Sequence, residues 1–331
     1  MSENRVCQWA WPLLLSVRNF LDNNRSNRPQ SFRYEPNTGD VLCESNANER
    51  SDLYLDPTGC WHIGNHLDLA IQQMLGLYLP ILGSPQQHCR VVAHLGQSVD
   101  ARIATSQGDA FFVTGKDNRI HLHRLRALCQ AVVVGAGTVA ADDPQLTTRE
   151  VSGSNPVRVI LDPQARLAPD FGVFNDCKSQ TLWMYDMAKS SAGRGSPLSD
   201  KQDVECVPMP VSKGRIAPEH VIKVLSDRGL NRVFVEGGGV TVSHFVKHGC
   251  VNRLQIACAP VIVGQGTNSL QIPGVPLMAD ALRPEYKLYR MGDDVMWDFN
   301  LDSAADRLGV QIVCDVSEQL PKSSSSFEQI M

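Results

Sequence analysis

The fold is decided by the stretch RVFVEGGGVTVSHFVKHG, residues 232–249, which predicts a buried strand, three glycines and a helix closed by Gly249. A helix that starts directly after such a turn presents unpaired N–H groups and the positive end of its dipole. Glycines there let a ligand approach the backbone closely. The stretch is therefore a candidate anion site suited to a pyrophosphate, although a tight turn without a ligand has the same pattern.

Strands and helices alternate on both sides of this stretch, over residues 89–301. Apolar runs rich in Val and Ile predict further strands at 131–137, 157–162, 181–186 and 253–264. Helices are expected at 119–129, with its arginines pointing outward, and at 218–229. Continuous apolar strands separated by helices are typical of a largely parallel sheet covered on both faces, so the sequence predicts an α/β fold.

Residues 1–88 have a different character, polar and irregular with islands of aromatic side chains. Glycine-containing turns at 37–39 and 57–59 predict two hairpins, and an amphipathic helix over 66–79 should end at Pro80. We interpret this region as a small N-terminal appendage of unknown role that packs on the larger domain. The last segment, 302–331, contains the polar run KSSSSF and is expected to be a partly disordered tail.

Composition narrows the functional classes. The 331 residues carry 31 Lys and Arg against 35 Asp and Glu, and the net charge of −4 argues against a general nucleic-acid surface. No apolar run approaches the roughly 18–20 residues that span a bilayer. Ten cysteines without a C-x-x-C pair fit reduced thiols, and nothing has zinc-ligand spacing. We expect a cytoplasmic protein with no nucleic-acid, membrane or metal partner.

Several polar residues are placed where parallel sheets bind ligands. Glu236 ends the strand before the three glycines, where a carboxylate is either paired structurally or faces a ligand. The segment 138–149, TVAADDPQLTTR, follows an earlier strand and is either a solvated loop or the lip of a cleft. Arg126 and Arg149 could bind a phosphate through their guanidinium forks, or could be solvated.

An earlier glycine run, GAGTVA at 135–140, satisfies the G-x-G-x-x-A pattern of dinucleotide-binding folds. A standard unit needs a helix after that run and an acidic residue at the end of the next strand, where Asp162 stands. The intervening segment is polar and leaves room only for a short helical piece near 139–142. The sequence therefore disfavours a standard dinucleotide-binding unit.

Taken in order, AHLGQSVDARIAT, the run from FFVTGKDN to DDPQLTTR, NPVRVILD, VFVEGGGVTVSHFV and APVIVGQG closely resemble the reductase domain of riboflavin biosynthesis. The resemblance covers roughly residues 90–300. It implies a dihydrofolate-reductase-like fold, a homodimer, and NADPH-dependent reduction of a ribosylaminopyrimidine 5′-phosphate to the ribitylamino product.

The resemblance also assigns residues to roles. It implies cofactor contacts at Gly96, Phe112, Thr138, Asp142, Gly238, Gly239, Val240, Thr241, Val242 and Ser243. It implies substrate contacts at Ala110, Arg126, Leu146, Arg149 and Glu236, with the two arginines holding the substrate phosphate. Reduction of an imine-like sugar raises the electron density on its nitrogen, and Glu236 is the candidate catalytic residue that holds or protonates that region.

The chain departs from the family pattern at three places. The first loop has Ser98-Val99-Asp100-Ala101 where Ser-Leu-Asp-Gly is common, His94 replaces a frequent Lys, and Ala110 replaces a hydroxyl. Residues 1–88 lack the H-x-E and P-C-x-x-C signatures, so no deaminase activity is expected. Two alternatives stay open: a related NADPH reductase that acts on another heterocycle or a pterin, and a non-catalytic nucleotide-binding homologue.

Overall fold

The computed structural model describes residues 3–24, 30–35, 37–44, 51–56, 59–83, 89–110, 113–190, 198 and 201–302. The described residues up to Pro80 form one compact unit, and those from Cys89 to Asp302, with Ile81–Gly83, form a second. The boundary at residue 88 stays a prediction. The expected tail lies outside the described residues, apart from Asp302.

The first unit combines two helices with a small antiparallel sheet. The helices are α1 (Glu3–Asn23) and α2 (Leu69–Leu82), and the strands, in the order β2-β1-β3-β4, are β1 (Gln30–Glu35), β2 (Asp40–Glu44), β3 (Leu53–Leu55) and β4 (Trp61–Ile63). The pairs β1–β2 and β3–β4 are the two expected hairpins. The ring of Phe32 contacts Phe20 and Trp61 at centroid distances of 5.4 and 5.9 Å and fixes the centre of this unit.

The expectation that Pro80 ends α2 is wrong, because the helix continues to Leu82. A proline inside a helix loses the hydrogen bond to the carbonyl four residues earlier. The neighbouring side chains Leu79, Ile81 and Leu82 are at most 3% exposed, so their burial offsets that loss.

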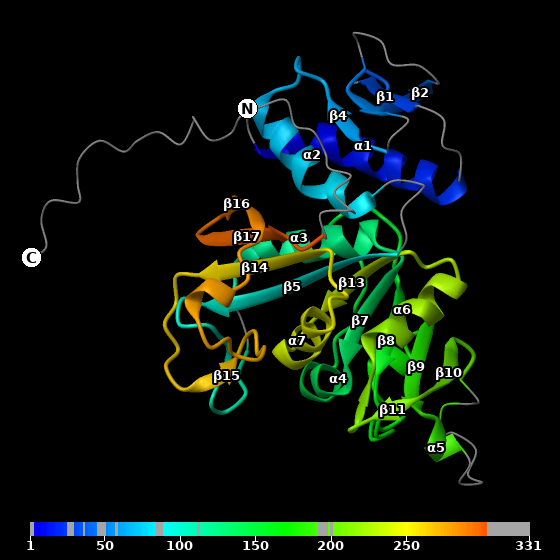
Figure 1. Cartoon of the computed structure of the whole chain (residues 1–331). Helices are drawn as coiled ribbons and strands as arrows, with labels where there is room; N and C mark the ends of the chain where they lie inside the picture. The colour runs from blue at the N-terminus through cyan, green and yellow to red at the C-terminus, as the bar shows by residue number, and fades with distance from the viewer. Residues whose placement is uncertain are drawn as a thin grey trace, which may run out of the picture. The chain divides into compact units, whose positions relative to one another are not determined.

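The second unit is built on a nine-stranded sheet, in the order β10-β9-β8-β7-β13-β5-β14-β17-β16. Its strands are β5 (Arg90–Ser98), β7 (Ala131–Gly135), β8 (Val157–Leu161), β9 (Thr181–Asp186), β10 (Val204–Met209), β13 (Arg232–Glu236), β14 (Arg253–Ala259), β16 (Glu285–Met291) and β17 (Asp294–Asn300). The strands from β10 to β14 are parallel, and only the pairs β14–β17 and β17–β16 are antiparallel (Figure 1). The expected largely parallel mixed sheet is confirmed.

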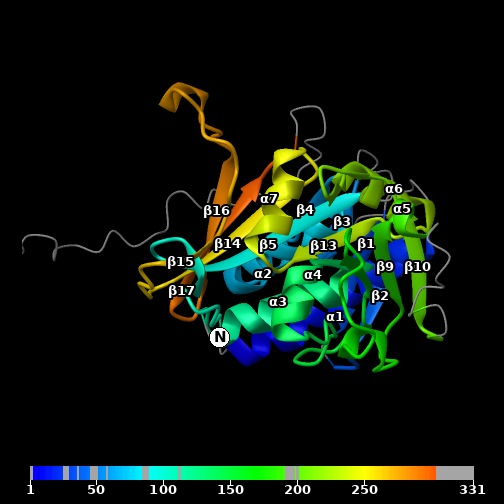
Figure 2. The ribbon, with the colours of Figure 1, turned by 90° about the horizontal axis from the view of Figure 1, so that it is seen from below.

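Helices cover both faces of this sheet. They are α3 (Lys116–Leu128), α4 (Ala136–Asp142), α5 (Met187–Ser190), α6 (Pro218–Asp227) and α7 (Gly239–Lys247). Figure 2 shows α3 and α4 on one face and α6 and α7 on the other. Val233 and Val235 pack in the same cluster as Phe245 of α7, whereas Phe234 points to the opposite face. Because both faces are covered, each strand is apolar at consecutive positions.

The remaining elements are short. They are β6 (Arg102–Thr105), β11 (Val211–Ser212), β12 (Arg215–Ile216), β15 (Gly266–Asn268), η1 (Gly172–Phe174) and η2 (Met278–Asp280). The parallel strands β5, β7, β8 and β13 all end at the same edge of the sheet, where the loops that carry the candidate site begin. β7, α4 and β8 form a strand-helix-strand unit, and α4 starts three residues before the helical piece expected at 139–142.

The turn between β5 and β6 contains a strained alanine. Ala101 has φ of 59°, in the left-handed region, at the position where the family resemblance has glycine. The turn is held by Asp100, whose carboxylate accepts hydrogen bonds from Ser98 Oγ at 2.6 Å and from the Gly264 amide at 2.7 Å. The bond from Ser98, followed by the backbone bonds from Val263 and Gly264, lowers the pKa of Asp100 to about 2. The turn thus keeps its geometry although Ala101 is strained.

We predict that Ala101→Gly raises the free energy of unfolding by about 0.5–1 kcal/mol. Relief of the left-handed strain contributes about 1–2 kcal/mol, and the greater freedom of glycine in the unfolded chain removes up to about 1 kcal/mol. Ala281→Gly is the control, because Ala281 has φ of −66° and gains nothing from glycine. Urea denaturation of both variants checks this, and equal losses of stability in the two would contradict it.

Candidate active site

A cavity of about 790 Å³ opens where the parallel strands of the second unit end. Its lining includes His94 and Gly96 of β5, Thr138 of α4, and Glu236 at the end of β13. The segment after β8 and the β11–β12 hairpin complete the wall. The volume falls within the range of about 300–1,000 Å³ that is usual for small-molecule and cofactor sites.

A side chain at each of the three glycines after β13 would meet a different obstacle. Gly237 has φ of 104°, which side chains rarely adopt, and a Cβ there would lie 3.1 Å from Thr138 Oγ1. The Gly238 amide donates to the same Oγ1 at 3.2 Å. A Cβ on Gly239 would collide with the backbone carbonyl of Ser269, so this glycine is required by a contact within the protein. Gly237 and Gly238 line the cavity, and they are the part of the turn that a ligand can reach.

The residues expected to contact the cofactor separate into two groups. Those that line the cavity are Gly96, Thr138, Asp142, Gly238, Val240 and Thr241. Three others lie behind the wall: Gly239, Val242, which is fully buried, and Ser243, whose Oγ accepts a hydrogen bond from the Gln271 amide at 2.7 Å. Phe112 lies outside the described residues. Partial burial raises the pKa of Asp142.

Arg126 and Glu236 form a two-pronged ion pair beside the cavity. Arg126 Nε donates to Glu236 Oε2 at 2.8 Å, Nη2 bonds Oε1, and Nη1 donates to the carbonyl oxygen of Thr147 at 3.1 Å. Glu236 borders the cavity, whereas Arg126 is only 7% exposed and lies behind it. The expectation that the arginines of α3 point outward is wrong for Arg126, because Glu236 draws it toward the sheet. Glu236 is thus both structurally paired and directed toward a ligand.

The other residues expected to contact the substrate lie around this pair. Ala110 lines the cavity, and Leu146 is buried with φ of 54°. The exposed side chain of Arg149 donates through Nη1 to Thr147 Oγ1 at 2.8 Å, and its amide donates to His123 Nδ1 at 2.9 Å. Burial, and then the charge of Arg126, lowers the pKa of Arg149. The two arginines therefore share one side of the site through Thr147.

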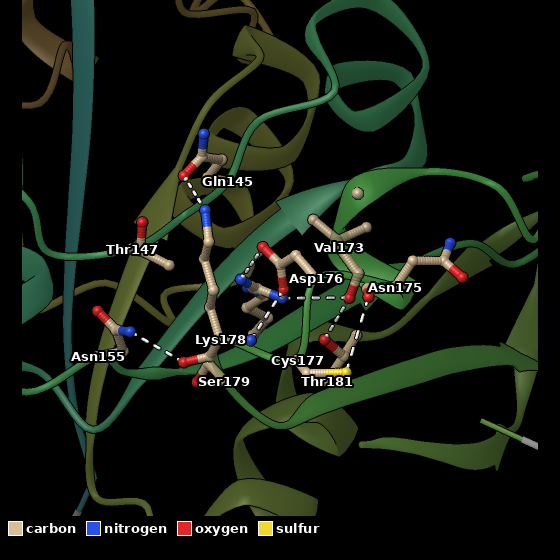
Figure 3. A network of polar contacts seen from close by, with 12 residues as sticks. Gln145, Thr147, Asn155, Val173, Asn175, Asp176, Cys177, Lys178, Ser179 and Thr181 are labelled. Atoms are coloured by element: carbon tan, nitrogen blue, oxygen red, sulfur yellow. Dashed lines mark hydrogen bonds and ion pairs between the residues drawn. The ribbon is translucent and has the colours of Figure 1, made fainter. Parts of the chain in front are cut away.

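A polar network anchors the loop that carries Leu146 and Arg149 (Figure 3). The fully buried Arg158 of β8 binds both carboxylate oxygens of Asp176 at 2.7 Å. Lys178 Nζ donates to Gln145 Oε1 at 2.9 Å, and Asn155 Nδ2 donates to the Lys178 carbonyl at 2.9 Å. Burial raises the pKa of Asp176, but the hydrogen bonds from Arg158 and from the Lys178 amide outweigh it and lower the pKa overall. These contacts fix the loop from both sides.

His94 is a cavity residue that the sequence marked only as a departure from the family pattern. It stands in register with Glu236 on the adjacent strand, so both side chains share the face that α3 covers. His94 Nε2 lies 2.9 Å from Asn118 Oδ1, and the His121 ring lies 5.6 Å away between centroids. Burial lowers the pKa of His94 to about 4. A neutral imidazole therefore occupies the position where a charged lysine is frequent in the family.

The RibD C-terminal domain family matches residues 90–294, which covers more than half of the chain. The chain belongs to this family. Its match includes the residues that line the cavity and every strand of the nine-stranded sheet except β17, of which it reaches only Asp294.

Curated relatives carry related names. A 2,5-diamino-6-ribosylamino-4(3H)-pyrimidinone 5′-phosphate reductase of Methanothermobacter thermautotrophicus is 30% identical over 217 residues, 64% of this chain and 97% of the relative. The riboflavin biosynthesis protein RibD of Bacillus amyloliquefaciens is 33% identical over 171 residues, 50% of this chain and 44% of that protein. The chain thus spans about half the length of such RibD relatives.

Solved structures confirm the dihydrofolate-reductase-like fold of RibD reductases. A diaminohydroxyphosphoribosylaminopyrimidine deaminase/5-amino-6-(5-phosphoribosylamino)uracil reductase of Thermotoga maritima matches with a TM-score of 0.53 and 25% identity, over 70% of this chain and 61% of that one. A riboflavin biosynthesis reductase of Saccharomyces cerevisiae matches with a TM-score of 0.54 and 20% identity, over 70% of this chain and 98% of that one. At 20% identity, the second match shows the fold alone.

No helix among the described residues is long and apolar enough to cross a membrane. Nor does the described part of the chain contain a group of three or more His, Cys, Asp or Glu side chains that could hold a metal ion.

We predict that Arg126→Met lowers the free energy of unfolding by about 3–5 kcal/mol, because it leaves the half-buried carboxylate of Glu236 without its partner. Arg119→Met is the matched control on the same helix. Its ion pair with Glu150 is 42% and 33% exposed at the two side chains, and its loss should cost about 1 kcal/mol or less. Denaturant titrations of both variants measure the difference. Similar losses in the two would show that the Arg126 pair does not stabilise the site.

Proposed function

We propose that this chain catalyses the NADPH-dependent reduction of a ribosylaminopyrimidine 5′-phosphate to its ribitylamino product. The reductase class and the riboflavin pathway follow from membership of the RibD C-terminal domain family and from the names of its relatives. The observation that carries the proposal is the Arg126–Glu236 pair, which stands at a cavity beside the Gly237–Gly238 turn.

The residues around that turn fit a dinucleotide. α7 is nine residues long, and the N–H groups of a helix's first turn have no partner within the helix. A Cβ on Gly238 would meet only Thr138 Oγ1, at 3.3 Å, so the backbone is open toward the cavity. The start of α7 and Thr138 would hold the diphosphate. When bound, NADPH would supply the hydride.

Glu236 and the two arginines would position the substrate. Arg126 binds both oxygens of the Glu236 carboxylate, so Glu236 is better suited to accept a hydrogen bond from the substrate than to donate a proton. Such a contact would hold the imine-like end of the open sugar in place for hydride transfer. Arg149 is exposed and would donate to the substrate phosphate. Arg126 is buried behind Glu236 and would act mainly by holding that carboxylate.

We predict that the purified protein oxidises NADPH in the presence of the ribosylaminopyrimidine phosphate, and that Glu236→Gln lowers turnover at least tenfold. The amide loses the charge that Arg126 holds and that the substrate would contact. Glu150→Gln is the control, because Glu150 pairs with Arg119 and does not border the cavity. Absorbance of the reduced coenzyme measures turnover.

Three outcomes would count against the proposal. Unchanged turnover in Glu236→Gln would remove Glu236 from any essential contact with the substrate. Oxidation with another heterocycle or a pterin, but not with the ribosyl compound, would favour the related reductase. Coenzyme binding without oxidation on any substrate would favour the non-catalytic homologue.

We also propose a homodimer in a reducing compartment such as the cytoplasm. The described cysteines include eight free thiols, which supports such a compartment. Exposed apolar side chains gather in segment 261–288, and β16 is the edge strand of the sheet. The most exposed are Ile262 at 80%, Met278 at 75%, Leu282 at 70% and Leu277 at 64%. Apolar patches of this kind mark protein interfaces.

We predict that light scattering gives twice the chain mass of 36.4 kDa. The double variant Ile262→Lys/Met278→Lys should shift the mass toward one chain, because it places charges on the apolar surface. Leu42→Lys, at a side chain 40% exposed in the first unit, is the control and should leave the mass unchanged. A single-chain mass for the parent protein would contradict the homodimer.

A further inference from the structure

His123 is a histidine of α3 that takes no part in the contacts assigned so far to coenzyme or substrate. It is buried, and the backbone amide of Arg149 donates a hydrogen bond to its Nδ1 at 2.9 Å. Because a main-chain N–H can only donate, Nδ1 is the unprotonated nitrogen of the ring, and a neutral imidazole then carries its proton on Nε2. His123 therefore acts as an acceptor in one fixed tautomer.

The surroundings keep this imidazole neutral. Burial is the main cause that lowers the pKa of His123 to about 4, followed by the charges of Arg126 and Arg149. The carboxylates of Glu150 and Glu236 raise the pKa, but they do not outweigh the other causes. At neutral pH the ring thus presents its Nδ1 lone pair to the Arg149 amide.

The helix α3 binds the backbone of the Arg149 loop at two points. His123 and Arg126 are three positions apart, and side chains at this spacing lie on the same side of a helix. Arg126 Nη1 donates to the carbonyl oxygen of Thr147 at 3.1 Å, while His123 accepts from the Arg149 amide. The helix thus supplies a donor and an acceptor to loop residues two positions apart and fixes the direction of the backbone between them.

The contacts of the neighbouring loop residues are made elsewhere. The Thr148 amide donates to Asn155 Oδ1 at 2.9 Å, which ties that residue to a different segment. The Arg149 side chain donates to Thr147 Oγ1 at 2.8 Å, within its own loop. The bond to His123 therefore ties the Cα of Arg149, from which the exposed guanidinium extends, directly to α3.

We propose that His123 is a positioning residue for substrate binding, which holds Arg149 through its backbone amide where the guanidinium meets the substrate phosphate. This inference rests on the proposed function, in which Arg149 donates to that phosphate. A backbone that is ordered before the substrate arrives does not have to be ordered on binding, so less of the binding energy is lost. The contribution of His123 should therefore appear in the affinity for the phosphorylated substrate and not in the hydride-transfer step.

Steady-state kinetics of the full chain test this role with matched substitutions. Asparagine places its Oδ1 where histidine has Nδ1, whereas glutamine places its Oε1 near the position of Nε2. His123→Asn should keep KM for the ribosylaminopyrimidine phosphate within about twofold of the parent value. His123→Gln and His123→Leu should raise that KM about tenfold, because they leave the Arg149 amide without its acceptor. In all three variants kcat and the affinity for NADPH should change less than about twofold.

The Arg149→Met background shows whether His123 acts through Arg149. Adding His123→Gln to that background should raise KM less than about twofold further, because the guanidinium that His123 positions is gone. The ribosylaminopyrimidine without its phosphate, measured as a competitive inhibitor, should bind the parent and His123→Gln equally. Val221→Ala is the control for a general loss of stability, since Val221 is fully buried on α6. It should lower the free energy of unfolding and leave KM unchanged.

Each contrary outcome has a separate meaning. An unchanged KM in His123→Gln and His123→Leu, or a full tenfold loss that persists in the Arg149→Met background, would overturn the positioning role and leave the proposed reductase intact. A folded His123→Asn variant with the KM of His123→Gln would also overturn it, because the acceptor at the Nδ1 position would then have no effect. No oxidation of NADPH by the parent with the ribosyl phosphate would overturn the proposed function itself.

Discussion

The ion pair between Arg126 and Glu236 is the interaction on which the site depends. A carboxylate at the end of a buried strand loses much of its hydration, and it is stable there only when a partner replaces the lost water. Arg126 provides that partner with two donors and uses a third on the Thr147 carbonyl. One guanidinium therefore joins α3, the end of β13 and the loop that carries Arg149. Under the proposed function, the same contact would also place Arg149, and with it the substrate phosphate.

The pair is the end of a polar row that crosses the sheet beneath α3. Glu236, His94, Gln255 and Asp298 stand in register on β13, β5, β14 and β17, so their side chains share one face. Asn118 and His121 of α3 bond His94 and Gln255, and Arg253 pairs with Asp298. The opposite face, under α6 and α7, is aliphatic. One face therefore stabilises the sheet, while the other aligns the polar groups that reach the cavity.

The strands and the glycine turn could be predicted because their signals are local. The expected strand over 181–186 matches β9, and the run 131–137 contains β7. The β16–β17 hairpin had no such signal. β16 is an exposed edge strand, and its sequence EYKLYRM mixes polar and apolar residues instead of forming an apolar run. The inward direction of Arg126 was missed because its partner is 110 residues away and lies beside it only after β13 enters the sheet. Periodicity along one helix does not contain that information.

Strain around the cavity is the other feature that sequence patterns do not reveal. Leu146, Ala165 and Lys213 have positive φ without being glycine, and each conformation costs about 1–2 kcal/mol. Such residues persist only where the surroundings determine the backbone. The Arg158–Asp176 network, through Lys178 and Gln145, holds the backbone of the loop that carries Leu146. Asp162 holds the backbone around Ala165, and the pairing of β11 with β12 holds that of Lys213. The loops that shape the cavity thus take their conformation from long-range contacts, which explains why local sequence predicts the sheet better than the site.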